Sequence, residues 1–401
     1  MGALTSEDAT KPASRAANPS AERADQPLAG RLLSLDVFRG LTIAAMILVN
    51  NAGDGAATYW PLKHSRWNGW TPTDLIFPFF LFIVGVSMVF SFASRLKRGD
   101  SRGRLMAHAL KRAVILFAIG VFLNGFPNGY HLGTIRIAGV LQRIALCYLV
   151  SSALVLWTGP RARLAAMAAC LIGYWVLMRF VPVPGFGVPT HSIPLLDPDR
   201  NLAAWLDRKL LMGHLYERVR DPEGVLSTLP AIATTLIGVL TGEGLRSAAS
   251  RKRKTGWMLA MGAAGLLAGK IFDVWFPINK KLWTSSYVLF TGGFALVCLA
   301  LCYWLLDLKQ RRGRWSLPAV VYGTNAIAAY VFSELLAHAL DGWHVHLADG
   351  SVLSCQEFIY QHSFAHLASP PNASLLYALA YVLLCWLITW LLYRRRIFIK
   401  V

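Results

Sequence analysis

Apolar runs of helical length, separated by short polar segments, fill the chain from about residue 31 onward. A transmembrane helix needs about 20 mostly apolar residues, because it rises about 1.5 Å per residue across a hydrocarbon core of about 30 Å. The pattern therefore predicts an all-α polytopic membrane protein with about ten transmembrane helices. We place these helices at residues 35–53, 72–94, 112–127, 138–158, 163–181, 226–245, 256–275, 285–306, 318–340 and 374–393.

The segments that connect these helices alternate in basic charge. Lys and Arg gather near residues 95–112, 161–163, 246–254, 309–314 and 394–400, whereas 341–373 has neither. The positive-inside rule assigns the basic set to the cytoplasm. Both termini are then expected in the cytoplasm, which requires an even number of spans and fits ten.

The parts of the chain outside these helices differ in composition. Residues 1–30 are rich in Ala, Ser, Pro and charge and have no apolar core of a signal peptide, so we expect a disordered cytoplasmic tail. Residues 31–401 are expected to form one transmembrane domain. Three longer segments on the other side, 54–71, 182–225 and 341–373, are expected to roof a cavity. Solvated loops are the alternative.

Composition and charge narrow the class of protein further. Hydrophobic residues make up 55% of the chain and charged residues 15%, whereas a soluble domain has about 25% charged residues. The net charge of +19 follows the membrane topology, so we expect no nucleic-acid partner. The six Cys form neither a disulfide framework nor a zinc spacing, and we expect no metal.

Four polar residues are expected at one membrane depth, on two adjacent helices: Asn50, His64, Asn68 and Asp74. Ionisable residues in membrane segments are costly and usually functional. His is suited to general-base chemistry near neutral pH, Asp can fix its tautomer, and Asn can donate to an oxyanion. The set suits acyl transfer, but it also suits proton-coupled transport. For a single His, a hydrogen bond to a loop is the structural alternative.

Arg39 lies eleven positions before Asn50, a rise of about 16 Å in a helix. A phosphate held near Arg39 would place the thioester at the end of an extended pantetheine arm near Asn50. Alternatively, Arg39 snorkels beside a capping Asp36 and anchors the helix.

Other polar residues lie further along the chain. Arg136 and Arg143 are seven positions apart, which places them on roughly one helix face. Residues 221–224 (DPEG) are expected to open a helix, where acidic residues favour the positive end of the dipole. A cap and a substrate contact both remain open there. For Lys270 and Asp273, an ion pair and a ligand contact also remain open.

Several ordered motifs resemble the heparan-alpha-glucosaminide N-acetyltransferase family. They are 35–40 (LDVFRG), the Val49-Asn50 pair, 63–69 (KHSRWNG), 74–78 (DLIFP), 135–143 (IRIAGVLQR), 221–224 (DPEG), 277–283 (PINKKLW) and 324–325 (TN). The resemblance runs from about residue 31 to the end of the chain. It implies a transmembrane acyltransferase domain over 31–401, with acetyl-CoA as cytoplasmic donor and a glucosamine-type amine as acceptor on the far side.

The resemblance also implies roles for particular residues. The family's catalytic His falls on His64 and its partner Asn on Asn50, and Asp74 would orient His64. Candidates for binding acetyl-CoA are Arg39, Arg112, Arg136, Gln142 and Arg143. Candidates for binding the sugar are Trp67, Asn68, Glu223, Asn279 and Asn325.

Some alternatives stay open from the sequence. We expect no large folded lumenal domain before the first helix, and we expect ten helices where the family has eleven. The acceptor is therefore either a free amino sugar or the end of a glycan. His64 either takes a proton from the amine or carries the acetyl group itself. The rival functions are a secondary transporter of a sugar or organic acid, for which no convincing repeat is found, and a glycan O-acetyltransferase.

The charge pattern and the tail suit a multi-pass protein of the bacterial inner membrane, with the acceptor in the periplasm. Expected partners are the amino-sugar substrate and membrane lipid. A homodimer is left open.

Overall fold

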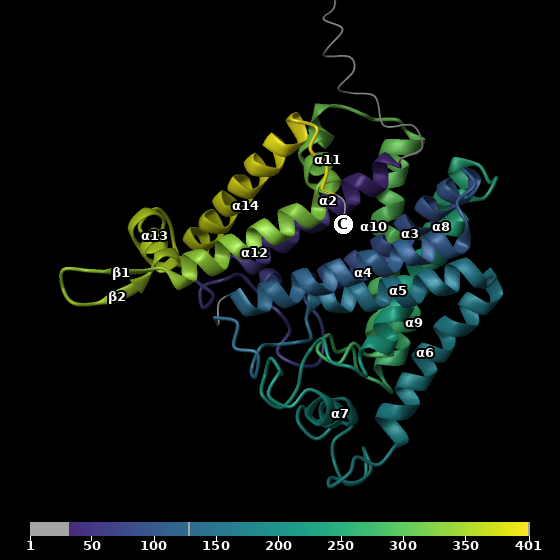
Figure 1. The fold of residues 1–401 in the computed structure, drawn as a ribbon, viewed down its shortest axis with the longest axis horizontal. Coiled ribbons are helices and arrows are strands. Elements are labelled where there is room, and N and C mark those ends of the chain that lie inside the picture. The colour runs from purple at the N-terminus through teal and green to yellow at the C-terminus, as the bar shows by residue number, and fades with distance from the viewer. Residues whose placement is uncertain (1–31, 127–128, 400–401) are drawn as a thin grey trace, which may run out of the picture.

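The computed structural model describes residues 32–126 and 129–399. The tail predicted over 1–30 lies outside these residues. The described chain is mainly helical, with one two-stranded sheet (Figure 1). Its longer helices are α2 (Leu33–Asn50), α3 (Ile76–Lys97), α4 (Arg102–Gly125), α5 (Val140–Trp157), α6 (Pro160–Phe180), α8 (Thr228–Arg246), α9 (Arg251–Asp273), α10 (Ser285–Tyr303), α12 (Ala326–Gly342) and α14 (Pro370–Arg394).

Shorter elements fill the connections. They are η1 (Trp60–Leu62), η2 (Pro72–Leu75), α7 (Leu202–Leu210), η4 (Trp304–Leu308), η5 (Arg314–Ser316), α11 (Leu317–Thr324), β1 (His344–His346), β2 (Val352–Ser354) and α13 (Cys355–Ser363). Within the described ranges, nine helices are long and apolar enough to cross a membrane, or ten if the bent pair formed by η5–α11 and α12 is one span. The prediction of an all-α polytopic membrane protein is confirmed.

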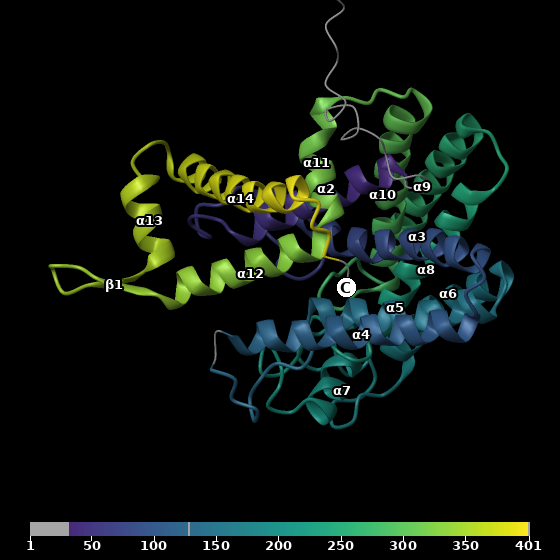
Figure 2. The ribbon, with the colours of Figure 1, turned by 45° about the horizontal axis from the view of Figure 1, so that its top comes forward.

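The centre of the bundle is formed by α3, α8 and α10 (Figures 1 and 2). Of α8, 67% is buried, whereas α6 and α9 are each 22% buried and present apolar faces outward. Close packing between α3 and α8 depends on Gly85 and Gly238. A Cβ atom at Gly85 would lie 2.1 Å from the Thr235 carbonyl oxygen. Small residues at such crossings are typical of helices that pack within membranes.

One predicted helix boundary is wrong by ten residues, because α4 begins at Arg102 rather than at 112. The Ser101 side chain caps this helix by accepting a hydrogen bond from Arg104 N. Leu105 and Ala109 are buried four positions apart, while the basic residues on either side of them, Arg102, Arg104 and Lys111, are exposed. A search for continuous apolar runs misses such an amphipathic first half.

The helix predicted over 318–340 is broken at Asn325, where α11 and α12 meet at 74°. Asn325 has a non-helical backbone with φ −123° and ψ 39°. Its buried side chain donates to the Ile397 carbonyl at 3.0 Å and accepts from Ile399 N at 3.0 Å. The segment after α14 is therefore bound into the break.

The three segments expected to roof a cavity take different courses. Segment 341–373 forms the β1–β2 hairpin and α13, which project from the bundle beyond α12 (Figures 1 and 2). The segments 54–71 and 182–225 instead lie over the ends of the central helices and contribute to a cavity. In the described chain, no residue of 341–373 lines that cavity. This part of the roof prediction is therefore wrong.

Candidate active site

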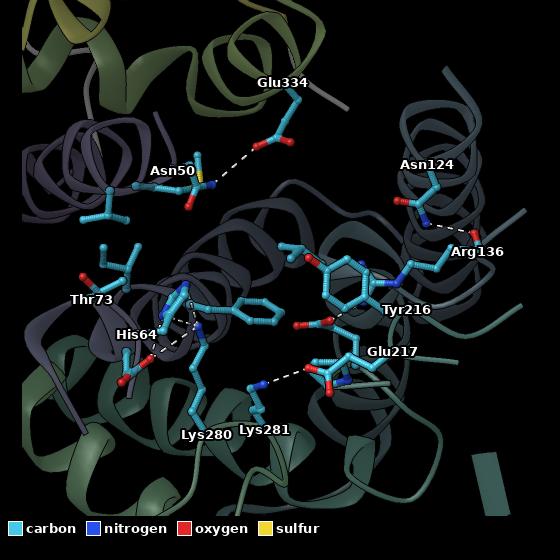
Figure 3. Close-up of a pocket in the computed structure, with 18 of the residues that line it drawn as sticks. Asn50, His64, Thr73, Asn124, Arg136, Tyr216, Glu217, Lys280, Lys281 and Glu334 are labelled. Atoms are coloured by element: carbon cyan, nitrogen blue, oxygen red, sulfur yellow. Dashed lines mark hydrogen bonds and ion pairs between the residues drawn. The ribbon is translucent and has the colours of Figure 1, made fainter. Parts of the chain in front are cut away.

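A cavity of about 930 Å³ lies between the ends of α2, α3 and α4, the side of α12 and three connecting loops (Figure 3). Its wall is apolar where the helices contribute Val49, Phe77, Phe80 and Leu123. It is charged where the loops contribute His64, Arg66, Arg136, Glu217, Glu223, Lys280 and Lys281. A polar site with apolar walls is the form that ligand sites usually take.

His64 and Asp74 form a pair in this cavity, with His64 Nδ1 2.8 Å from Asp74 Oδ1. The His64 side chain is 51% exposed, whereas that of Asp74 is 1% exposed. His64 lies in the loop between α2 and η2, and Asp74 lies in η2 at the start of the second span. The buried carboxylate thus holds an imidazole that reaches into the cavity.

The backbone fixes Asp74 in its acceptor role. Its Oδ2 accepts from Ser65 N and from Thr71 N, each at 3.0 Å. Because an ionised carboxylate only accepts, we assign the proton between Asp74 and His64 to Nδ1. His64 Nε2 then carries the lone pair. This tautomer suits a general base or a nucleophile.

Lys280, on the loop after α9, completes this group. Its Nζ is 3.0 Å from Nδ1 and 3.4 Å from Nε2 of His64, and 3.5 Å from Asp74 Oδ1. Burial lowers the pKa of Lys280, and the charges of Asp74 and Glu223 act in the opposite direction. A desolvated ammonium therefore lies beside the imidazole.

Asn50 and Glu334 form another part of the wall. Asn50 Nδ2 donates to Glu334 Oε1 at 3.5 Å, at the end of α2 and in the middle of α12 (Figure 3). His338 lies one turn further along α12 and also lines the cavity. A carboxylate at membrane depth is a candidate partner for a cationic substrate group.

A third group joins loop 129–139 to loop 211–227. Arg136 makes a two-point contact with Asp221, at 2.9 and 2.7 Å, and a 2.5 Å contact with Glu223. The Tyr216 ring stacks on its guanidinium with 4.5 Å between Cζ and the ring centroid. The group of one Arg and two carboxylates carries one net negative charge, and Arg136 and Glu223 are its members in the cavity lining.

A network of charges borders the same loop. Glu217 accepts from Lys281 at 2.8 Å and from Arg220 at 2.5 Å. Burial raises the pKa of Glu217, but these two hydrogen bonds outweigh it, and the net shift is downward. Arg220 also covers the Trp67 ring at 4.9 Å, and Trp67 Nε1 donates to the Leu196 carbonyl. Trp67 is thereby held between the loops.

The predicted site residues divide into two sets by position. Those that line the cavity are Asn50, His64, Trp67, Asp74, Arg136 and Glu223. Those outside the lining are Arg39, Asn68, Arg112, Gln142, Arg143, Asn279 and Asn325. The expectation that Asn50, His64, Asn68 and Asp74 gather at one end of the first two helices agrees with their positions, although His64 and Asn68 lie in the connecting loop.

Arg39 lies within the bundle, away from the cavity lining. It contacts Asp36 at 3.0 Å, the Gly323 carbonyl at 3.0 Å and Ser87 Oγ at 2.8 Å. These bonds tie α2 to α3 and α11. They agree with the anchor alternative for Arg39, and a phosphate contact would require the exchange of one of these partners.

The remaining candidates for binding acetyl-CoA are packed against neighbouring side chains or backbone. Arg143 is 1% exposed and donates to the Gly224 carbonyl and Ser227 Oγ, beneath the Trp283 ring. Arg112 lies over the Tyr148 ring. Gln142 packs against Gly120. Because Arg136 precedes α5 and Arg143 lies inside it, the expectation that the two share a helix face is wrong.

Asn68 and Asn279 join two loops. Asn279 Nδ2 donates to Asn68 Oδ1 at 3.1 Å, and Gly69 N donates to the Ile278 carbonyl at 2.7 Å. Asn279 is fully buried and accepts from Leu282 N. In the structure, these two residues therefore hold the His64 loop against the Lys280 loop.

Two other expectations can be decided. Residues 221–224 do not open a helix, because α8 begins at Thr228 and the acidic side chains bind Arg136 instead. Lys270 and Asp273 form an ion pair of 3.2 Å outside the cavity lining. Of the two alternatives, an ion pair or a ligand contact, the structure agrees with the ion pair.

Sequence reasoning missed Lys280, Lys281, Glu217 and Glu334 as lining residues. Lys280 and Lys281 form a basic pair in a connection on the non-cytoplasmic side, which is otherwise poor in basic residues. That contrast could have indicated a functional role. Glu334 is a carboxylate inside an apolar helix, which was a second signal. Among the described residues, no group of three or more His, Cys, Asp or Glu could hold a metal ion. The absence of a metal stays a prediction.

Membrane-length helices around a polar cavity with an Asp–His pair define a polytopic membrane protein whose site can transfer protons and host a nucleophile. A sequence model of the family described as heparan-alpha-glucosaminide N-acetyltransferase, catalytic, matches residues 31–270. The chain belongs to this family.

Two relatives of known name are similar to the chain. The heparan-alpha-glucosaminide N-acetyltransferase of Mus musculus is 33% identical over 364 residues, which cover 77% of this chain and 54% of the relative. That of Homo sapiens is 33% identical over 361 residues, covering 76% and 53%. The chain thus spans about half the length of the relatives that it matches.

Proposed function

We propose that the protein is a transmembrane N-acetyltransferase that moves an acetyl group from acetyl-CoA to the amine of a glucosamine-type sugar. The observation that carries this proposal is the Asp74–His64 pair, with Nε2 of His64 reaching into a cavity of about 930 Å³. Membership of the family supports the reaction class. The names of the two relatives support an amino-sugar acceptor.

His64 acts at Nε2, and Asp74 holds the ring and stabilises the imidazolium that forms. In direct transfer, the sugar ammonium first loses one proton to solvent, and Nε2 then takes the second proton as the neutral amine attacks the thioester carbon. In a two-step route, Nε2 attacks first and carries the acetyl group to the amine. Both routes use the same tautomer, which the backbone around Asp74 maintains.

The acceptor is bound at the negatively charged part of the wall. A glucosamine amine is largely cationic near neutral pH. Glu334, which accepts from Asn50, and Glu223 line the cavity and offer carboxylates to it, and Trp67 is a further lining residue. Asn68, Asn279 and Asn325 act from outside this lining, by holding loops or helix ends. The acceptor is a free amino sugar or a glycan end.

The donor approaches from the cytoplasm, with its phosphates near basic residues. The basic candidates that remain are Arg39, Arg112 and Arg143, and the uncharged Gln142 is a further candidate; each lies outside the cavity lining. Arg136 was also a candidate, but its two carboxylate partners favour a cation over a phosphate at that wall. We place the enzyme in a bacterial inner membrane, in contact with lipid, with the acceptor in the periplasm.

Isotope transfer tests the function. Purified protein in detergent is given labelled acetyl-CoA together with glucosamine, or with glucose as a matched sugar that lacks the amine. We expect labelled N-acetylglucosamine from the first sugar and no stable product from the second. Movement of unchanged glucosamine into liposomes, with no acetylation, would support the transporter instead. Product from glucose would support an O-acetyltransferase.

A further inference from the structure

The ammonium of Lys280 lies beside His64 in a geometry that a simple ion pair does not explain. Its Nζ is at nearly equal distances, 3.0 and 3.4 Å, from the two ring nitrogens. An ammonium in line with one lone pair would lie much farther from the other nitrogen. Lys280 is therefore next to the imidazole without taking the lone pair of Nε2.

Asp74 does not depend on Lys280 for its hydrogen bonds. Its Oδ1 binds His64 at 2.8 Å, and its Oδ2 accepts from two backbone N–H groups. The contact from Lys280 Nζ to Oδ1 is 3.5 Å, longer than the about 2.7–2.9 Å of a charge-assisted hydrogen bond. Within the described chain, the ammonium has no shorter carboxylate contact. A cation kept at such a distance from its counter-ion is costly to bury.

The backbone holds Lys280 in this place. Asn279, the residue before it, is fully buried and bonded to Asn68 and to Leu282 N. The bond from Gly69 N to the Ile278 carbonyl joins the same loop to the His64 loop. The ammonium is thus pre-positioned against His64, and does not require a loop to close.

We propose that Lys280 is a catalytic residue whose ammonium stabilises the oxyanion of the acyl transfer at His64. This inference rests on the proposed acetyltransferase function. The attacking nitrogen forms a bond to the carbonyl carbon, and the π electron pair of the carbonyl moves to its oxygen, which accepts from Lys280. The carbonyl then re-forms, and the carbon–sulfur bond breaks with its electron pair leaving on the sulfur of CoA.

The proton balance is closed in either route. The proton lost by the amine reaches the thiolate through His64 in direct transfer, or through solvent in the two-step route. An oxyanion forms in both, so the role of Lys280 does not depend on which nitrogen attacks. In the two-step route the reacting carbon is bonded to Nε2, and because Nζ is 3.4 Å from Nε2, the oxygen of that carbon falls within reach of the about 2.7–3.1 Å that oxyanion donors require.

Substitution of Lys280 by Met tests the proposal, with Lys270→Met as a matched control outside the cavity. Both variants are compared with wild type by labelled acetyl transfer to glucosamine and by thermal unfolding. We expect Lys280→Met to lower kcat by about 10²–10³-fold, with little change in KM for acetyl-CoA, since the lost bond forms only in the transition state. Lys270→Met should keep the wild-type rate, and Lys280→Arg should recover part of the loss because it keeps the charge.

Several outcomes would overturn this role. A folded Lys280→Met protein with wild-type kcat would do so, as would a raised KM at unchanged kcat, which would make Lys280 a binding residue. If Lys280→Met does not fold, Lys280→Gln and Lys280→Arg are compared, and equal rates would reject the need for a cation. Wild-type protein that transfers no acetyl group would reject the proposed function, and the role of Lys280 with it.

Discussion

At the scale of single residues, the site depends on how firmly Asp74 holds His64. Replacing Asp74 by Asn preserves shape, but the amide no longer enforces a proton on Nδ1, and it cannot stabilise an imidazolium by charge. We expect acetyl transfer by Asp74→Asn to fall by about 10²–10⁴-fold while the fold is kept. Transfer rates and unfolding curves are compared with those of Asp341→Asn, an exposed Asp outside the cavity lining. A well-folded Asp74→Asn protein with wild-type transfer would remove Asp74 from the mechanism.

A second residue-scale prediction concerns Asp207 in α7. Burial raises the pKa of Asp207 to about 6, against about 3.9 in an unfolded chain. Because the folded state binds this proton more tightly, the raised pKa stabilises the fold at pH values below the pKa of the unfolded chain. That stabilisation is lost as the pH rises from about 4 to about 6. The shift corresponds to about 3 kcal/mol. Asp207→Asn keeps an acceptor for Val225 N, and it avoids the cost of burying an ionised carboxylate.

The advantage of Asp207→Asn in unfolding temperature should therefore be larger at pH 7.5 than at pH 4.5. Unfolding in detergent at both pH values measures it, with Asp199→Asn as an exposed control on the same segment. Parallel curves for Asp207→Asn and wild type at the two pH values would contradict the burial argument.

The sequence revealed only part of the site at this scale. His64, Asn50 and Asp74 follow one another within a short stretch, so their proximity was predictable from helix ends alone. Lys280 and Glu334 reach the same cavity from more than 200 positions away, and a single sequence does not show such a pairing. Arg39 and Arg143 looked like phosphate ligands because helix periodicity does not show which partners a buried guanidinium finds.

At the scale of elements, the break between α11 and α12 is the feature with the clearest test. Asn325 bonds to Ile397 and Ile399 and lies outside the cavity lining. Asn325→Ala should leave a backbone donor and a backbone acceptor unsatisfied, each worth about 1–3 kcal/mol. We expect a lower unfolding temperature and faster proteolysis after α14, with KM for the sugar unchanged.

The control for Asn325→Ala is Asn372→Ala, an exposed Asn at the start of α14. A raised KM for the sugar at unchanged stability would instead return Asn325 to the substrate-binding residues proposed from the sequence.

The elements that the sequence predicted well are those whose apolar runs span the bilayer without interruption. Hydropathy located α3, α8 and α10 within a few residues. It missed α7, the β1–β2 hairpin and the first half of α4, because short or amphipathic segments carry no long apolar run. Hydropathy predicted α11 and α12 as one helix, because the bend between them depends on hydrogen bonds to backbone far along the chain.

At the scale of the whole molecule, orientation in the membrane is the main prediction. The basic loops 95–112, 246–254 and 309–314 are expected in the cytoplasm, together with both termini. Reporter fusions after residue 401 and within 341–373 test this directly. We expect a cytoplasmic signal from the first and a periplasmic signal from the second. The reverse pattern, or both on one side, would contradict ten spans with cytoplasmic ends.

The central claim is that His64 carries out the acyl transfer, and one measurement tests it most directly. Labelled acetyl transfer to glucosamine is followed for wild type, His64→Ala and the control His346→Ala on the exposed hairpin. Wild type and His346→Ala should transfer alike, whereas His64→Ala should be slower by at least about 10²–10⁴-fold with folding and acetyl-CoA binding retained. A folded His64→Ala protein that transfers acetyl groups at the wild-type rate would contradict the account.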